Sequence, residues 1–116
     1  MQDLKQRTKQ FAVRVIRLVD ALPRKRSANV IGHQLLRSAT SVGANYRAAR
    51  RARSTAEFRA KLGIVEEEAD ESAYWLELIV EAQLMKDNLV TGLLSEANEL
   101  TAITVASLKT SKKKAS

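Results

Sequence analysis

The sequence predicts an all-α protein, an antiparallel four-helix bundle whose successive helices run up and down. The chain of 116 residues has 4 Gly and 1 Pro, too few for a protein built from many turns. Its commonest residues include Ala, Leu, Glu, Lys and Arg, which are strong helix formers. Apolar residues recur three and four positions apart in four segments. The connections between these segments are short, and short connections favour antiparallel neighbours.

The first helix is expected from about Asp3 to Ala21. Asp is a good N-cap residue because its carboxylate accepts a hydrogen bond from a free amide of the first turn. Pro23 is expected to end the helix, since the residue before a proline disfavours the α conformation. The short basic segment after Pro23 then forms the first connection.

The second helix is expected from an N-cap at Ser27 to about Arg51. Small and polar residues, Ser38 among them, lie beside its apolar stripe and would let a neighbouring helix approach closely. Gly32 and Gly43 weaken the helix by up to about 1 kcal/mol each relative to Ala. We therefore expect both glycines at close contacts where a side chain has no room.

The third and fourth helices complete the bundle. Ser54 to Glu57 reads as a capping box, in which the hydroxyl and the carboxylate each satisfy an amide of the first turn. The third helix is expected to reach about Lys86 and the fourth to span Leu89 to about Leu108. We expect residues 1–108 to form one domain and residues 109–116 to form a basic disordered tail.

The third helix is apolar on two sides, whereas a helix in a lone bundle needs one buried stripe. The second stripe therefore predicts a homo-oligomer interface. The alternative is that both stripes merge into one wide face in a tightly wrapped monomer. The residues of the second stripe are Ile64, Trp75, Leu78, Ala82 and Met85.

Nothing in the sequence indicates an enzyme, so we expect no catalytic residue, no cofactor and no metal. There is no Cys, and His33 is the sole histidine. No glycine-flanked serine elbow and no glycine-rich phosphate loop occurs. The acidic residues between 66 and 71 are expected to pair with arginines of the second helix or across subunits. Without a signal peptide or a long apolar stretch, the sequence predicts a cytoplasmic protein outside the membrane.

The charge is unevenly spread, and this suggests an anionic partner. The formal net charge is +7, and residues 1–61 hold 15 of the 20 Lys and Arg but 3 of the 13 Asp and Glu. Nucleic acid is the first candidate partner. A solvated basic face, or cations placed favourably at a helix C-terminus, is the alternative. Guanidinium groups match phosphate oxygens, so the candidate nucleic-acid-binding residues are Arg37, Arg47, Arg50, Arg51 and Arg53.

Two segments resemble a known family. Residues 34–46, which read Gln-Leu-Leu-Arg-Ser-Ala-Thr-Ser-Val-Gly-Ala-Asn-Tyr, with residues 50–54 and 58–62, look like the signature of four-helix-bundle proteins related to the 23S ribosomal RNA intervening-sequence protein. Residues 64–78 resemble a common subgroup. The resemblance covers roughly residues 5–108. Many relatives carry an acidic residue where this chain has Ala48, so the segment is more basic here.

The family is similar to the accessory variability protein of diversity-generating retroelements. That similarity implies a barrel-like ring of five bundles and a basic surface for nucleic acid and a reverse transcriptase. Our leading hypothesis is therefore a non-enzymatic homo-oligomer that binds RNA or DNA, with RNA favoured by the resemblance. The alternative is a scaffold or interaction module that docks an acidic protein partner such as a polymerase.

Overall fold

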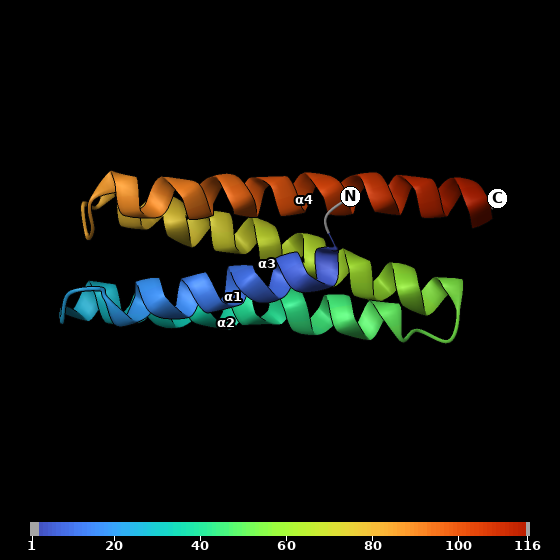
Figure 1. The fold of residues 1–116 in the computed structure, drawn as a ribbon, viewed down its shortest axis with the longest axis horizontal. Helices are drawn as coiled ribbons and strands as arrows, with labels where there is room; N and C mark the ends of the chain where they lie inside the picture. Colours follow the sequence, from blue (N-terminus) through green and yellow to red (C-terminus); the bar gives the residue numbers. More distant parts are fainter. Residues whose placement is uncertain (1–2, 116) are drawn as a thin grey trace.

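The computed structural model describes residues 3–115, with side chains described for residues 3–112. Four helices, α1 (Leu4–Asp20), α2 (Arg26–Arg50), α3 (Thr55–Glu81) and α4 (Asp87–Ala115), account for nearly all of this range, and no strand occurs within it. Successive helices run in opposite directions, with turns at alternate ends, and the molecule measures 49 × 20 × 20 Å (Figure 1). The predicted all-helical fold of four helices is confirmed.

Two helix starts have the predicted N-cap residue, although in the described residues only the serine half of the predicted capping box is formed. The Asp3 carboxylate accepts a hydrogen bond from the amide of Lys5 at 3.0 Å, so Asp3 caps α1. The Ser54 hydroxyl accepts from the amide of Glu57 at 3.0 Å, so Ser54 caps α3. Both caps satisfy amides that a helix start leaves without a partner.

The predicted N-cap of α2 at Ser27 is wrong. Lys25 takes that position in an extended conformation, with φ −130° and ψ 153°, and Ser27 lies inside the first turn. The amide of Lys25 donates to the carbonyl of Pro23 at 2.9 Å. This tight turn reverses the chain, so that α2 begins at Arg26, before Ser27. The Lys25 carbonyl then accepts from the amide of Asn29 at 2.9 Å.

Helix α3 ends at Glu81, five residues before the predicted Lys86. Gln83 adopts a left-handed conformation, with φ 55°. The Leu84 amide donates to the carbonyl of Ile79, and the Gln83 amide donates to the carbonyl of Val80, both at 3.0 Å. This pair of bonds is the Schellman motif, which closes a helix and usually places glycine where Gln83 stands. Without a glycine there, the sequence carried no sign of this helix end.

Helix α4 is longer than predicted at both ends. It begins at Asp87 and not at Leu89, and it continues past Leu108 to Ala115. The expectation of a disordered tail is therefore corrected for residues 109–115, which are helical, and Ser116 lies outside the described residues. No Gly or Pro follows Gly92 to stop the helix, and lysines near its C-terminal end are favoured by the helix dipole.

The core runs along the bundle axis and draws on all four helices. Helix α1 contributes Phe11 and Val15, both fully buried, and α3 contributes Leu76 and Ile79. In the described residues no helix is both long and apolar enough to cross a membrane. The core cluster comprises Phe11, Val15, Leu18, Leu35, Ala39, Val42, Val65, Ala69, Ala73, Leu76, Ile79, Val90, Leu93, Ala97 and Leu100.

Small residues bring neighbouring helices close together, as predicted. Ser38 of α2 and Ser72 of α3 are fully buried, and their hydroxyl oxygens lie 2.9 Å apart. Each hydroxyl oxygen also lies within hydrogen-bond distance of a backbone carbonyl of its own helix. One hydroxyl therefore donates to the other, which donates to its own carbonyl, and neither is left unsatisfied.

At Gly32, an added Cβ would lie 3.1 Å from the Leu22 side chain and 3.3 Å from that of Val19, so the contact there is tight as predicted. At Gly43, an added Cβ would lie 3.5 Å from the Thr8 carbonyl oxygen, which is ordinary contact, so the prediction of no room is wrong there.

We predict that the size of residue 38, more than its hydroxyl, sets the α2–α3 contact. Ser38→Ala should lower the free energy of unfolding by less than about 1 kcal/mol, because Ser72 keeps its carbonyl acceptor. Ser38→Val should lower it by about 1–3 kcal/mol, because the added methyl groups force the helices apart. Chemical denaturation measures both. Equal stability of the two variants would contradict the prediction.

Candidate nucleic-acid interface

Four of the five candidate arginines lie together at one end of the bundle. Arg47, Arg50 and Arg51 occupy the end of α2, and Arg53 lies in the connection before the Ser54 cap. All four are exposed. The C-terminal end of a helix carries partial negative charge from unpaired carbonyls, so it tolerates this density of cations.

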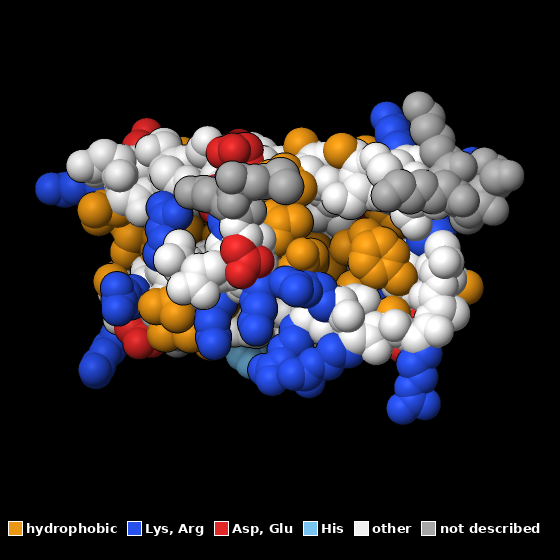
Figure 2. Space-filling model, turned by 45° about the vertical axis from the view of Figure 1, so that its right-hand side comes forward, with side chains coloured by type: hydrophobic (Ala, Val, Ile, Leu, Met, Phe, Trp, Pro, Cys, Tyr) orange, Lys and Arg blue, Asp and Glu red, His pale blue; other side chains and the backbone are white. Residues whose placement is uncertain are grey.

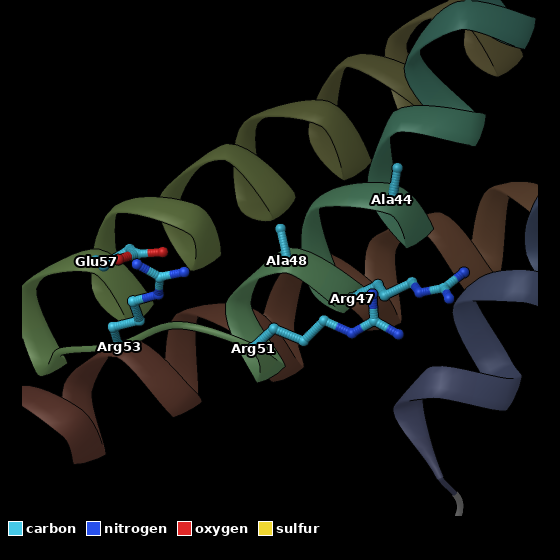
Figure 3. A pocket seen from close by; sticks show the side chains of 6 residues that line it. All are labelled: Ala44, Arg47, Ala48, Arg51, Arg53 and Glu57. Carbon is cyan, nitrogen blue, oxygen red and sulfur yellow. The ribbon is translucent and has the colours of Figure 1, made fainter.

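Three of these arginines surround a shallow cavity of about 490 Å³. Arg47 and Arg51 extend to the same side of α2, and Arg53 folds back beside Glu57 at the other end (Figure 3). Ala44 and Ala48 complete the lining, and each contributes only a methyl group (Figure 3). The result is a concave surface with three cations and one carboxylate.

The basic surface continues from this cavity onto α1. A second cavity of about 190 Å³ lies between α1 and α2, and Arg47 lines both. Lys5 and Lys9 of α1 line this second cavity, with Gly43 among the residues at its α2 wall. Basic side chains accordingly gather over the lower helices in Figure 2. The cavity arginines and these two lysines are called the basic face below.

Arg50 points to a different part of the surface. Its guanidinium lies 3.6 Å from the carboxylate of Asp3, and both side chains are about half exposed. An exposed pair of this kind contributes little to stability. Arg50 lines a larger groove between the α2–α3 turn and α4, which it shares with Arg53.

The structure does not bring Arg37 together with the other four arginines. Its guanidinium donates to Glu68 at 2.9 Å and also to Glu71 of α3. Burial lowers the pKa of Arg37, but the charges of Glu68 and Glu71 and the bonds to them outweigh this effect and raise it. The expected pairing of the acidic segment with an arginine of the second helix is thus observed, and Arg37 belongs to the α2–α3 contact.

Sequence reasoning missed the role of Arg7. Its guanidinium donates two hydrogen bonds of 2.7 Å to the carboxylate of Glu96 and lies 2.9 Å from that of Glu99. These bonds to Glu96 and Glu99 raise the pKa of Arg7, while burial opposes the rise. The pair joins α1 to α4, the first helix to the last. Nothing in the linear sequence indicates which acid of α4 faces Arg7.

The residues of the predicted oligomer interface lie along one side of α3 and the turn after it. Ile64 and Leu78 are half-buried, and Trp75 and Met85 pack in part against the core. Because α3 ends at Glu81, Ala82 and Met85 lie beyond the helix and do not extend its stripe.

The indole of Trp75 is fixed in place. It donates to Glu71 at 3.0 Å and meets the ring of Tyr74 edge to face, with 5.0 Å between the centroids. Tyr74 is 52% exposed, so an apolar surface remains open beside Trp75.

The described residues contain no cluster of side chains suited to a metal ion. His33 is exposed on α2, and no group of three or more acidic or histidine side chains in this part of the chain could hold a metal ion.

The model of one protein family, described as 23S rRNA-intervening sequence protein, matches residues 2–106 of the chain. The chain belongs to this family. The resemblance noted in the sequence is thereby confirmed, and the match includes α1, α2, α3, most of α4 and all four clustered arginines. No match is found among curated proteins.

One solved structure has the same fold as this chain. It is the crystal structure of a protein of unknown function from the S23 ribosomal protein family of Bacteroides thetaiotaomicron. The two sequences are 34% identical, and the match covers 92% of this chain and 99% of the other, with a TM-score of 0.86. The bundle described above is therefore similar to one observed experimentally.

We predict that the Arg7 pair matters more for stability than the Arg50 pair. The Arg7 side chain is 16% exposed and that of Glu96 is 15% exposed, so Arg7→Met leaves a largely buried carboxylate unpaired. With partial solvent screening, the expected loss of unfolding free energy is about 1–2 kcal/mol. Arg50→Met is the control and should change stability by less than about 0.5 kcal/mol.

Chemical denaturation at low and at high salt checks this prediction. The difference between the two variants should shrink at high salt, because ions screen what remains of the Arg7 pair. Equal losses in the two variants would mean that the Arg7 pair does not hold α1 against α4.

Proposed function

We propose that this chain is a non-enzymatic, homo-oligomeric, basic four-helix bundle that acts in the cytoplasm and binds nucleic acid through its basic face. One observation carries the proposal. In the described part of the chain, no acidic side chain lies within ion-pair distance of Arg47, Arg51 or Arg53. By contrast, Arg7 and Arg37 each have two such partners. A concave surface with three such guanidinium groups suits phosphate oxygens.

The chemistry of the face favours contact with the sugar–phosphate backbone. Tyr46 is the aromatic residue nearest in sequence to the arginines, and it is half-buried against the core. The cavity itself is lined by arginine, alanine and Glu57 and offers no ring for a base to stack on. Recognition would then depend on charge and shape more than on base sequence. The family's description, which mentions ribosomal RNA, supports RNA over DNA.

We predict that replacing Arg47, Arg51 and Arg53 with Ala weakens binding to a labelled RNA hairpin and flattens its salt dependence. Each lost phosphate contact should reduce the slope of log K against log salt by about 0.7–0.9, so the triple variant should lose about 2–3 in slope. Fluorescence anisotropy between low and physiological salt measures the affinity and the slope. Circular dichroism shows whether the helices are retained.

The matched control removes the same charge from the opposite end of the bundle. Arg24, Lys25 and Arg26 are exposed in and after the α1–α2 turn, and their replacement with Ala should weaken binding much less. Arg37→Ala should leave affinity unchanged, because its partners are Glu68 and Glu71. Equal weakening by both triple variants would show a response to net charge and not a binding face.

Self-association is the second part of the proposal. The open apolar surface on α3 supports it, since Tyr74 is exposed and Ile64 and Leu78 are only half-buried. At Gly63, an added Cβ would meet nothing within 4 Å, so this side of α3 is free in the single chain. If the assembly is a ring of five, five copies at +7 each total +35 and attract polyanions more strongly.

We predict a mass several times 12.9 kDa by light scattering coupled to size exclusion at high salt. Ile64→Glu and Leu78→Glu should each reduce this mass, because a charge at a buried contact costs more than the contact contributes. Val30→Glu is the control, since Val30 is 58% exposed on α2 outside the α3 surface. A monomeric wild-type protein would remove the oligomer from the proposal and leave the basic face to be tested alone.

A further inference from the structure

A long groove lies at the end of the bundle that α1 does not reach. Arg7 of α1 pairs with Glu96 and Glu99 of α4, so these residues lie at the same level. Helix α1 begins three residues before Arg7, at Leu4, whereas α4 continues from Glu99 to Ala115. At 1.5 Å per residue, α4 therefore extends about 20 Å beyond the start of α1.

The start of α1 is a specified helix end. The carboxylate of Asp3 caps the helix through the amide of Lys5 and lies near Arg50 of α2. Beyond this cap, only three of the described helices continue. They are the end of α2, the start of α3 and the end of α4. The guanidinium of Arg59 on α3 donates a hydrogen bond of 3.0 Å to the Leu108 carbonyl, which links α3 to α4. The groove occupies the place of a fourth helix.

The floor of the groove is apolar. Phe58 of α3 and Ile103 of α4 are half-buried there, whereas Phe11 and Val15, which α1 contributes farther along the axis, are fully buried. Figure 2 shows hydrophobic side chains in the hollow between α4 above and the lower helices. The groove has a volume of about 930 Å³, and its lining residues come from the end of α2, the α2–α3 connection, the start of α3 and the C-terminal half of α4.

The two walls of the groove differ in charge. Arg50 and Arg53 stand on the α2 side, and the α4 wall presents the hydroxyls of Ser107, Thr110 and Ser111. Among the residues with described side chains, no acid lines the groove. A complementary ligand therefore combines an apolar face for the floor with negative charge on one flank.

We propose that this groove binds an amphipathic α-helix of another protein, with one apolar stripe and acidic residues along the flank that meets Arg50 and Arg53. The space left by α1 suits a helix, because it continues the layer in which α1 packs against α2 and α4. The residues of α4 that line the groove, Ile103 to Ser111, span about 12 Å, which corresponds to a little over two helical turns. The proposal does not depend on nucleic-acid binding, since the groove shares only Arg53 with the cavity that Arg47 and Arg51 line.

The experiment uses the full chain and two fluorescein-labelled synthetic peptides of about 14 residues. Both carry the same leucine stripe at helical spacing, and one has Glu on the flank where the other has Lys. The Glu peptide should bind saturably by fluorescence anisotropy. The Lys peptide should bind at least about tenfold more weakly, because its charges oppose those of Arg50 and Arg53.

Two tryptophan variants locate the binding. Ser107→Trp places a large side chain in the groove and should weaken the Glu peptide at least about tenfold. Ser95→Trp places the same side chain at an exposed position of α4 outside the groove and should leave the affinity unchanged. Affinity for the labelled RNA hairpin should be the same in both variants.

Several outcomes would overturn the proposal. These are no saturable binding of the Glu peptide, equal binding of the Lys peptide, or equal weakening by Ser95→Trp. A lower mass of Ser107→Trp in light scattering, with peptide affinity unchanged, would assign the groove to a contact between copies of this chain. Loss of RNA affinity in Ser107→Trp alone would assign it to nucleic acid.

Discussion

The close contact between α2 and α3 is the constraint on which the rest of the structure depends. Ser38 and Ser72 meet inside it, and both side chains are fully buried. This contact fixes the direction of α2 and thereby the place where its last turns emerge from the bundle. It also fixes which acids of α3 lie opposite which arginines of α2. The charge pattern of the surface is thus a consequence of helix packing.

The register of this contact decides which arginines remain without an acidic partner. The acids of α3 are concentrated between residues 66 and 71, opposite the middle of α2, and Arg37 meets them there. The first turns of α3, which lie opposite the end of α2, contain one acid, Glu57. Arg47, Arg51 and Arg53 therefore reach a region with little negative charge.

Local signals in the sequence were sufficient for much of the fold, and tertiary contacts account for what they missed. Asp3 and Ser54 were predictable as caps because a cap depends on its own side chain and the next few amides. The left-handed Gln83 was not predictable, since its conformation follows from how α3 turns into α4. Arg37 and Arg47 are both arginines of α2. Their roles differ because the acids of α3 lie opposite Arg37 and not opposite Arg47. The groove was likewise invisible, because it depends on the relative lengths of α1 and α4.

The end of α2 therefore serves two surfaces at once. Its last turns present Arg47 and Arg51 to the basic face and Arg50 to the groove, and Arg53 borders both. Charges this close interact through the low-dielectric protein as well as through water. A negative flank seated beside Arg50 and Arg53 would lower the positive potential at the neighbouring cavity, and a phosphate in the cavity would do the same at the groove. Ligands at the two sites should oppose one another, and by thermodynamic linkage each would weaken the other by the same factor.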